Sequence, residues 1–311
     1  MSSESTLLAR LRHLATHPAA RGLADDVAVL GDLVLTHDTI VEGVHYLPTD
    51  PPESVGWKLG AVNLSDLAAK GAVPSGALLS LTLRGDDQWE ERFLSGLAQI
   101  FEHFELPLLG GDTVALPEGA PRVLGLTAIG KAGPSVPSRT GGQVGDRLWL
   151  VGPIGDSAAG LALLTDDPGA TGLLVDTYRR PIPLLAVGAL LAPHASAMMD
   201  VSDGLLLDAR RLATASGCGL RVDLSALRLS PAFIAERGQH RAARLFAATG
   251  GDDYALLAAL PPSFDPLTIL KGTSVNIACV GELTGDGAFA LADDFGPVPL
   301  PERLGYEHHP S

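Results

Sequence analysis

The sequence contains few of the groups that hold disulfides, soft metals or nucleic acids. Its 311 residues include two cysteines, Cys218 and Cys279, so we expect two small thiols in a reducing cytoplasm, with no disulfide framework and no zinc site. Lysine and arginine number 22 against 36 acidic residues, and a net charge of −14 argues against a nucleic-acid partner. No apolar run approaches the roughly 18 residues of a membrane span, and the N-terminus has no signal pattern. We therefore expect a cytoplasmic protein without a membrane partner.

The common sequence signatures of phosphate-binding and nucleophilic sites are also absent. The chain has no G-x-x-x-x-G-K-[ST] loop, no G-x-G-x-x-G after a strand, no H-R-D and D-F-G pair and no G-x-S-x-G elbow. Only four lysines occur, Lys58, Lys70, Lys131 and Lys271. If the ligand is a phosphate ester, its charge must be neutralised largely by cations from outside the chain. Segment 155–160 either offers helix amides to an anion or simply packs closely.

The length and the 46% hydrophobic content fit two globular domains. In the first half, the patterns predict a helix within 1–20, helices at 51–70 and 87–104, and strands at 33–40, 77–83, 106–109 and 122–130. Residues 132–146, rich in Gly, Pro and Ser, predict a linker. The second half predicts strands at 148–151, 197–201, 219–223, 255–260, 275–280 and 288–292, with helices near 183–192, 204–216 and 263–270. This order predicts a two-domain α+β or α/β protein, divided into 1–135 and 136–311.

Aspartates follow several of the predicted strands. Asp38 ends the run that begins at Leu33, Asp112 follows 106–109, and Asp200 and Asp203 follow Met199. A single Asp in such a place is usually a turn former or a helix cap. Several of them predict carboxylates gathered at one edge of a sheet, where all-oxygen ligands favour Mg²⁺ bridging to substrate phosphates.

The helix at 51–70 carries a further carboxylate in an unusual place. Asp50 is predicted as its N-cap, Pro51 as its first residue, Glu53 as a capping-box partner and Gly71 as its stop. Asp66 falls on the apolar stripe of this helix, where a carboxylate is costly unless it is paired or binds a metal. The alternative is a rotated helix in which Asp66 only caps the end.

Seven short motifs then occur in an order that resembles one known family. They are Gly-Leu-Ala-Asp25-Asp26-Val-Ala-Val, Thr36-His37-Asp38-Thr39, Val62-Asn-Leu-Ser-Asp66-Leu-Ala-Ala-Lys-Gly71, Gly110-Gly111-Asp112-Thr113, Gly155-Asp-Ser-Ala-Ala-Gly-Leu161, Asp200-Val-Ser202-Asp203-Gly-Leu205 and Gly250-Gly-Asp252-Asp253-Tyr254. From about residue 22 to the Gly305–His309 tail, the chain resembles the thiamine-monophosphate kinases of the aminoimidazole-ribonucleotide-synthetase-like superfamily.

The resemblance implies ATP-dependent phosphorylation of thiamine monophosphate to thiamine diphosphate, by direct in-line transfer with several Mg²⁺ ions. It implies a homodimer whose N-terminal mixed sheets together form a β-barrel, with a C-terminal α/β sandwich domain. The implied Mg²⁺ ligands are Asp26, Thr36, His37 (through its backbone), Asp38, Asp66, Asp112, Asp200 and Asp203, of which Asp38, Asp66, Asp112 and Asp203 are the expected catalytic residues. The implied ATP contacts are Gly111, Asp112, Arg139, Ser202 and Phe104. The implied substrate contacts are His45, Asp252 and Tyr306.

Three positions depart from the family pattern. Gly-Gly-Asp252-Asp253-Tyr254 stands where Gly-Gly-Glu-Asp-Tyr is common, and His37 stands where Ser or Thr is usual. Arg303 occupies the place of an aromatic residue that covers the thiamine rings, so Tyr306 is the expected substitute. Without the resemblance, His45 reads as a turn histidine packed beside Tyr46.

Two alternative functions are consistent with the same residues. One is another superfamily enzyme, of the purine-pathway synthetase type. The other is a non-catalytic nucleotide-binding dimer, although an inactive protein has no need to keep a full set of carboxylates.

Overall fold

The computed structural model describes residues 3–307. The first half contains, in chain order, α1 (Ser3–Leu11), the 3₁₀ turn η1 (Pro18–Leu23), β1 (Ala28–Leu30), β2 (Leu33–Val41), α2 (Pro52–Ala69), β3 (Val73–Leu83), α3 (Asp87–His103), β4 (Leu108–Ala115) and β5 (Val123–Lys131). The second contains β6 (Arg147–Val151), α4 (Asp156–Asp166), α5 (Leu173–Arg179), α6 (Leu185–Leu191), η2 (Ala192–His194), β7 (Ala197–Val201), α7 (Leu205–Ala215), β8 (Gly219–Asp223), η3 (Leu224–Ala226), α8 (Pro231–Arg237), α9 (Arg241–Thr249), β9 (Ala255–Leu260), η4 (Pro266–Thr268), β10 (Ile277–Thr284), β11 (Phe289–Asp293) and β12 (Gly296–Val298).

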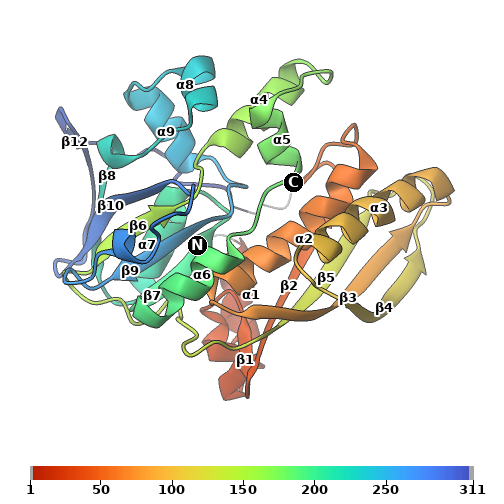
Figure 1. The fold of residues 1–311 in the computed structure, drawn as a ribbon, viewed down its shortest axis with the longest axis horizontal. Helices are drawn as coiled ribbons and strands as arrows, with labels where there is room; N and C mark the ends of the chain where they lie inside the picture. The colour runs from red at the N-terminus through yellow and green to blue at the C-terminus, as the bar shows by residue number, and fades with distance from the viewer. Residues whose placement is uncertain (1–2, 308–311) are drawn as a thin grey trace.

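The chain folds into two α+β domains, each built on a mixed sheet (Figure 1). The first sheet has the order β1-β2-β5-β3-β4, in which only β3 and β4 pair in parallel. Along β2, Val34, Thr36 and Ile40 are buried while His37 and Thr39 are exposed. Because successive side chains alternate between the faces of a strand, Thr36 and Asp38 point to the same, inner face as Val34 and Ile40. That face contributes to the core that α2 and α3 share with the sheet.

The second sheet has the order β12-β11-β8-β10-β6-β9-β7 and is antiparallel except for the β8–β11 pair. Every residue of β7 and β9 is buried, and α7 and α9 pack into the same core. Apolar strands covered on both faces read as continuous hydrophobic runs, which explains why the sequence located these two strands within their observed limits. No helix within residues 3–307 has both the length and the apolar character that crossing a membrane requires.

Helix α2 lies between the two sheets and belongs to the cores of both domains (Figure 1). All but one of its 18 residues are buried. Its first turns pack on α3, while Ala68 and Ala69 pack with Trp149, Val187 and Met198 of the second domain. This burial on all sides fixes the rotation of the helix, and with it the direction of every polar side chain that it carries.

The contact of α6 with α2 depends on the absence of a side chain at Gly188. A Cβ atom at this position would overlap the backbone carbonyl of Ala68, and backbone cannot move aside as a flexible side chain can. We expect Gly188→Ala to lower the free energy of unfolding by about 2 kcal/mol. Chemical denaturation measures it, with Ala186→Ser on the exposed face of α6 as the control. Equal stability of the two variants would contradict a tight helix contact.

Four expectations about the elements are wrong. Gly110–Asp112 lie inside β4, because this strand continues past the residues that were taken to follow it, whereas the predicted strand at 33–40 that carries Thr36–Asp38 is confirmed. The segment 263–270 forms only the turn η4, since Pro266 and the following Lys271-Gly272 limit it. Helices α5, α8 and α9, each seven to nine residues long, were not predicted. Helix α2 begins at Pro52, and Asp50 does not cap it.

Candidate metal and phosphate site

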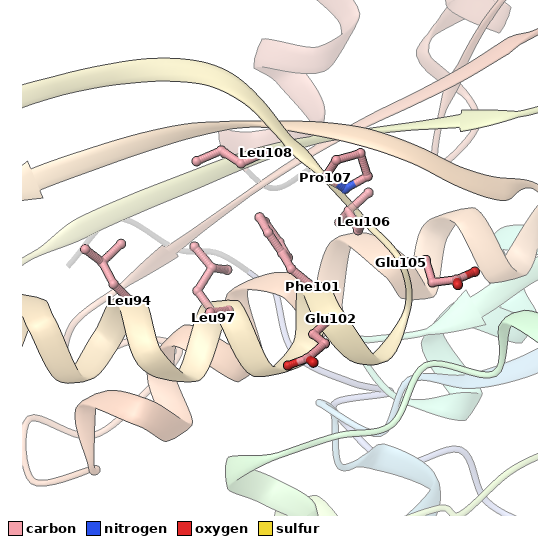
Figure 2. A pocket seen from close by; sticks show the side chains of 9 residues that line it. Leu94, Leu97, Phe101, Glu102, Glu105, Leu106, Pro107 and Leu108 are labelled. Atoms are coloured by element: carbon pink, nitrogen blue, oxygen red, sulfur yellow. The ribbon is translucent and has the colours of Figure 1, made fainter.

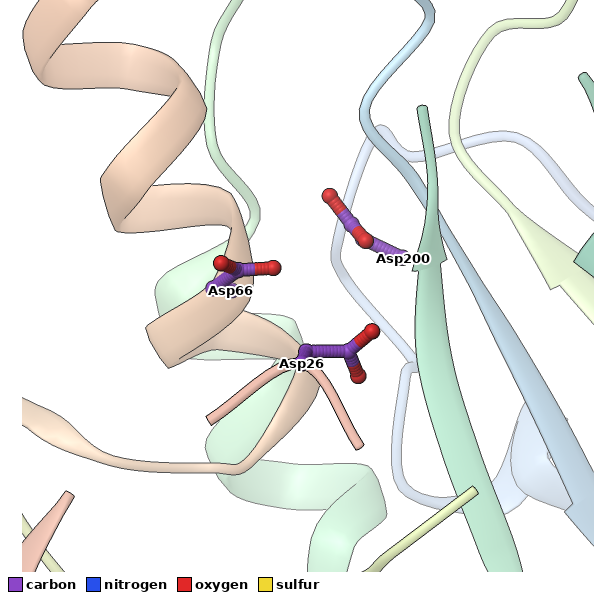
Figure 3. A group of neighbouring side chains, drawn as sticks. All are labelled: Asp26, Asp66 and Asp200. Carbon is purple, nitrogen blue, oxygen red and sulfur yellow. The ribbon is translucent and has the colours of Figure 1, made fainter. Parts of the chain in front are cut away.

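Three carboxylates from three separate segments meet where the two domains join. Asp26 comes from the loop before β1, Asp66 from the last turns of α2, and Asp200 from β7. One oxygen of each lies within 4.8 Å of the others. Figure 3 shows the three side chains directed toward a common space. Hard oxygen donors gathered at this spacing can hold a divalent cation.

Neighbouring polar groups fix the orientation of these carboxylates. Thr36, on the inner face of β2, donates its hydroxyl hydrogen to Asp66 Oδ2. Ser65 donates to Asp200 Oδ2 over 2.7 Å and so links α2 to β7. The backbone N–H of Asp38 donates to Asn63 Oδ1 at 3.0 Å, which ties β2 to the same helix. The prediction that Asp66 lies on the buried face of its helix is confirmed, and the rotated-helix alternative is wrong.

Burial and mutual repulsion raise the pKa values of Asp38, Asp66 and Asp200. Burial, with the charges of Asp26 and Asp203, raises the pKa of Asp38 to about 6. Burial and the charge of Asp26 raise the pKa of Asp200 to about 8. The pKa of Asp66 lies well above its usual range because of burial and the charges of Asp38 and Asp200. In the absence of a cation, these groups hold protons at pH values where isolated carboxyls are ionised.

Basic side chains surround the outer side of the cluster. Lys70 Nζ lies 2.6 Å from Asp25 Oδ1 and 2.5 Å from Asp26 Oδ2. Arg139, in the segment between the domains, donates from Nε to Asp26 Oδ1 over 2.7 Å. Arg21 pairs with Asp25 at 2.5 Å. Burial alone would raise the pKa of Asp25, but Lys70 and Arg21 lower it to about 2.

A second acidic group follows β7. Asp203 lies in the loop after this strand, and Asp208 lies in the first turn of α7. Arg211 forms ion pairs with Asp203 and, at 2.9 Å, with Asp208. Burial and the charge of Asp203 raise the pKa of Asp208 to about 7. The backbone N–H of Tyr306 donates to the carbonyl of Asp203 at 2.8 Å, so the C-terminal segment returns to this loop. His308 and His309 lie outside the described residues.

Asp252 is held by three side chains on the other side of the β7 loop. Lys58 of α2 lies 2.5 Å from Asp252 Oδ2, Ser157 donates to the same oxygen over 2.9 Å, and Tyr254 donates to Oδ1 over 2.8 Å. Lys58 itself is buried, 4.0 Å from the centre of the Tyr178 ring. Asp252 has a left-handed backbone, with φ of 70°, and its N–H donates to the carbonyl of Ser202. This contact places Asp252 beside the β7 loop.

Two further sequence expectations concern loops near this end of the molecule. The imidazole Nδ1 of His45 accepts a hydrogen bond from the Val41 N–H at 3.0 Å, so the ring closes the turn after β2. The N-terminus of α4 is occupied by the protein itself, because Asp253 accepts a hydrogen bond from the Gly155 N–H at 2.8 Å. The carboxylate of Asp253 thus takes the position that an external anion would take.

Other predicted site residues do not join the cluster within one chain. Asp112 pairs in register with Ser80, whose side chain is on the exposed, outer face of the first sheet. Strands β4 and β2 are three strand spacings apart, or about 14 Å. Gly111 adjoins β3 so closely that a Cβ would overlap the Leu79 carbonyl. Phe104 follows α3, where its ring packs edge-on against His103. The His37 ring, also on the outer face, contacts Thr127.

The sequence reasoning missed the basic partners Lys58, Lys70 and Arg211, the acids Asp25 and Asp208, and the hydroxyl of Ser65. The sequence did contain one signal of the two missed lysines. Two of the four lysines lie on or directly after the most apolar long helix, at positions 58 and 70, in a chain that has little lysine elsewhere. Lysines in such a place are expected to be paired with carboxylates.

Comparison with known proteins agrees with this architecture. Residues 24–132 match the AIR synthase related protein, N-terminal domain, and residues 143–294 match the corresponding C-terminal domain. The thiamine-monophosphate kinase of Caulobacter vibrioides is 38% identical over 94% of this chain and 86% of its own. The thiamine-monophosphate kinase of Escherichia coli is 35% identical over 92% of this chain and 91% of its own.

A solved structure has the same fold over nearly the whole chain. The structure of AaThiL complexed with AMPPCP and TMP superimposes with a TM-score of 0.82 and 28% identity, covering 97% of this chain and 96% of that one. Both family domains and the curated relatives span most of the sequence. The chain therefore belongs to the thiamine-monophosphate kinase family of AIR synthase related proteins.

Proposed function

We propose that this chain transfers the γ-phosphoryl group of ATP to thiamine monophosphate, forming thiamine diphosphate and ADP. The observation that carries the proposal is the group of Asp26, Asp66 and Asp200, whose oxygens lie within 4.8 Å of one another at the junction of the domains. The names of the relatives and the ATP analogue AMPPCP in the AaThiL complex support the same reaction.

The residues at the junction fit Mg²⁺. They are hard oxygen donors with little competing sulfur or nitrogen, and burial together with neighbouring negative charge raises the pKa values of Asp66 and Asp200. Asp26 Oδ2 is buried and accepts no hydrogen bond from the described residues. Within the proposal, Asp26, Thr36, Asp38, Asp66, Asp200 and Asp203 hold Mg²⁺, with the His37 carbonyl as a further ligand. When bound, the ions supply the positive charge that neutralises the phosphoryl oxygens.

The proposed reaction requires the protein to align two phosphate groups more than to transfer protons. The acceptor phosphate is largely ionised at neutral pH, so no general base is needed to deprotonate it. The proposed roles of the side chains are therefore to hold two phosphate groups in line and to exclude water. Lys58, Arg139 and Arg211 lie among the carboxylates and supply fixed positive charge beside them.

The remaining contacts are assigned from the family resemblance. We assign the thiamine monophosphate contacts to His45, Asp252 and Tyr306, the last two of which adjoin the β7 loop that carries Ser202 and Asp203. Gly111, Asp112, Arg139, Ser202 and Phe104 are assigned to ATP. Residues 1–135 would bind metal and ATP and form the dimer, and residues 136–311 would complete the nucleotide and substrate site.

A homodimer would give a role to the proposed site residues that do not join the cluster within one chain. The outer face of the first sheet exposes Leu78 and Leu109, at 42% and 60%, and carries Asp112 beside them on β4. Next to it, an apolar groove lies between α3 and the segment that leads into β4 (Figure 2). Its lining includes Leu94, Leu97, Phe101 and Leu108. Exposed apolar area of this kind is typical of interfaces, and we propose that two such sheets face one another as a β-barrel.

Product analysis tests the proposed activity. We expect thiamine diphosphate and ADP when the chain is incubated with ATP, Mg²⁺ and thiamine monophosphate, and no product when EDTA replaces Mg²⁺. ATP binding without product would favour the regulatory dimer, and turnover only with a purine-pathway precursor would favour the other superfamily enzyme.

Direct in-line transfer makes a further prediction about intermediates. We expect no phosphorylated protein during turnover, because the acceptor attacks ATP itself and no protein nucleophile intervenes. The measurement is a rapid acid quench of the chain with [γ-³²P]ATP, with and without thiamine monophosphate. A labelled protein that is chased into thiamine diphosphate would contradict direct transfer.

A further inference from the structure

Lys70 contacts the candidate metal site from a fully buried position. It follows the last residue of α2, one turn after Asp66, and its side chain has no exposed surface. The ammonium group lies 2.6 Å from Asp25 Oδ1 and 2.5 Å from Asp26 Oδ2, and it donates to the Met198 carbonyl over 2.9 Å. Three oxygens thus surround the ammonium group: two carboxylate oxygens that form ion pairs with it and one carbonyl oxygen that accepts its hydrogen bond.

These contacts join the three segments that carry the cluster. Asp26 is paired with Lys70 directly, Asp66 precedes it by one turn on the same helix, and Met198 lies two residues before Asp200 on β7. A single side chain therefore connects the loop, the helix and the strand whose carboxylates must meet. No other lysine of the chain touches two of these segments within the described residues.

The geometry at Asp26 leaves one oxygen available. Arg139 donates to Oδ1 with hydrogen-bond geometry, whereas Oδ2 is close to the Lys70 ammonium but accepts no aligned hydrogen bond from the described residues. The lysine contacts Oδ2 as an ion-pair partner at 2.5 Å, and a carboxylate oxygen has a second lone pair beside that contact. That oxygen remains available to a metal ion that approaches from the side of Asp66 and Asp200.

We propose that Lys70 is a positioning residue that serves as a built-in cation of the metal centre. It keeps the three carboxylate segments together in the metal-free protein, and its fixed positive charge weakens the affinity of the cluster for divalent ions. This inference rests on the proposed use of Mg²⁺ at the cluster. Two kinds of cation would then neutralise the cluster: the ammonium group of Lys70, which belongs to the chain, and divalent ions from solution.

The first test uses Lys70→Met, which keeps the length of the side chain and removes its charge. Lys271→Met, at an exposed position far along the chain, is the matched control. Free Mn²⁺ is measured by electron paramagnetic resonance, without nucleotide, and thermal unfolding is followed in EDTA and in saturating Mg²⁺. We expect Lys70→Met to bind Mn²⁺ about tenfold more tightly than the wild type, to unfold at a lower temperature in EDTA, and to recover most of that loss in Mg²⁺.

A second variant keeps the test decisive if Lys70→Met does not fold. Asp25→Asn removes the other carboxylate partner of Lys70, so Asp26 becomes the remaining carboxylate that faces the ammonium, and we expect Mn²⁺ binding to weaken severalfold. Opposite changes in the two dissociation constants are not expected of a lysine that only supports the fold. Unchanged or weaker Mn²⁺ binding by Lys70→Met, or unchanged binding by Asp25→Asn, would overturn the inference. Failure of the wild type itself to bind Mn²⁺ would instead overturn the proposed metal site.

Discussion

Replacement of Asp66 by asparagine is expected to abolish most turnover while making the metal-free protein more stable. Asp66 is buried, and the like charges of Asp38 and Asp200 repel its carboxylate. As a proposed Mg²⁺ ligand it acts on the developing phosphoryl charge, and its loss should lower kcat by about a hundredfold or more. Removal of its charge relieves repulsion in the absence of metal, which should raise the free energy of unfolding in EDTA by about 1–3 kcal/mol.

Two measurements separate these effects. Steady-state turnover with ATP and thiamine monophosphate gives the catalytic loss, and denaturant unfolding in EDTA and in Mg²⁺ gives the stability. Asp32→Asn, at an exposed position in the β1–β2 hairpin, is the control and should change neither. If Asp66→Asn turned over at near the wild-type rate, Asp66 would be removed from the catalytic set. If Asp66→Asn were less stable than the wild type in EDTA, favourable contacts of the Asp66 carboxylate would outweigh its repulsion by Asp38 and Asp200.

The stability of the metal-free protein is expected to fall as the pH rises from about 4 to 8. The folded-state pKa values of Asp38, Asp208 and Asp200 are about 6, 7 and 8, against about 3.8 in the unfolded chain. Between these values the native state binds more protons than the unfolded state, so stability is present at low pH and is lost as each carboxyl ionises. For one carboxyl with a pKa of about 6, the loss is about 3 kcal/mol.

Magnesium should remove most of this dependence, because bound cations stabilise the ionised carboxylates. Unfolding midpoints in urea, measured at several pH values in EDTA and in saturating Mg²⁺, check the prediction. A flat profile in EDTA would mean that these carboxyls are already neutralised by Lys70, Arg139 and Arg211. A slope that persists in Mg²⁺ would place its origin elsewhere, since Asp208 faces Arg211 and Asp203 as well.

The sequence located part of the fold accurately. Strands 197–201 and 255–260 were predicted within their observed limits because buried strands read as apolar runs, and strand 219–223 because its buried and exposed residues alternate. The short helices α5, α8 and α9 were missed, since seven to nine residues show too few turns for a helical period to be recognised. The strand that carries Asp112 was ended too early, because its polar residues were taken for a turn where the strand continues.

The sequence pointed to most acids of the candidate site and to Arg139, and it missed Lys58, Lys70 and Arg211. Asp66 and Asp200 stand out in the sequence by their position on apolar elements, and Asp26 is indicated by the family resemblance; the structure brings the three together. Lys70 and Arg139 pair with Asp26 across 44 and 113 residues, respectively, and no local period encodes such distances. Their partners depend on how the loop before β1 lies against the end of α2, which is a property of tertiary packing.

Helix α2 has a consequence for how the chain can be divided. Since its residues complete the apolar interiors on both sides, the covalent boundary near residue 135 is not a boundary of hydrophobic packing. A fragment that ends there would leave Ala68 and Ala69 uncovered, and a fragment that begins there would lack the helix that closes its own interior. The halves should therefore behave as complementary fragments that assemble through this helix. Substitutions on its two sides are expected to be inherited together in related sequences.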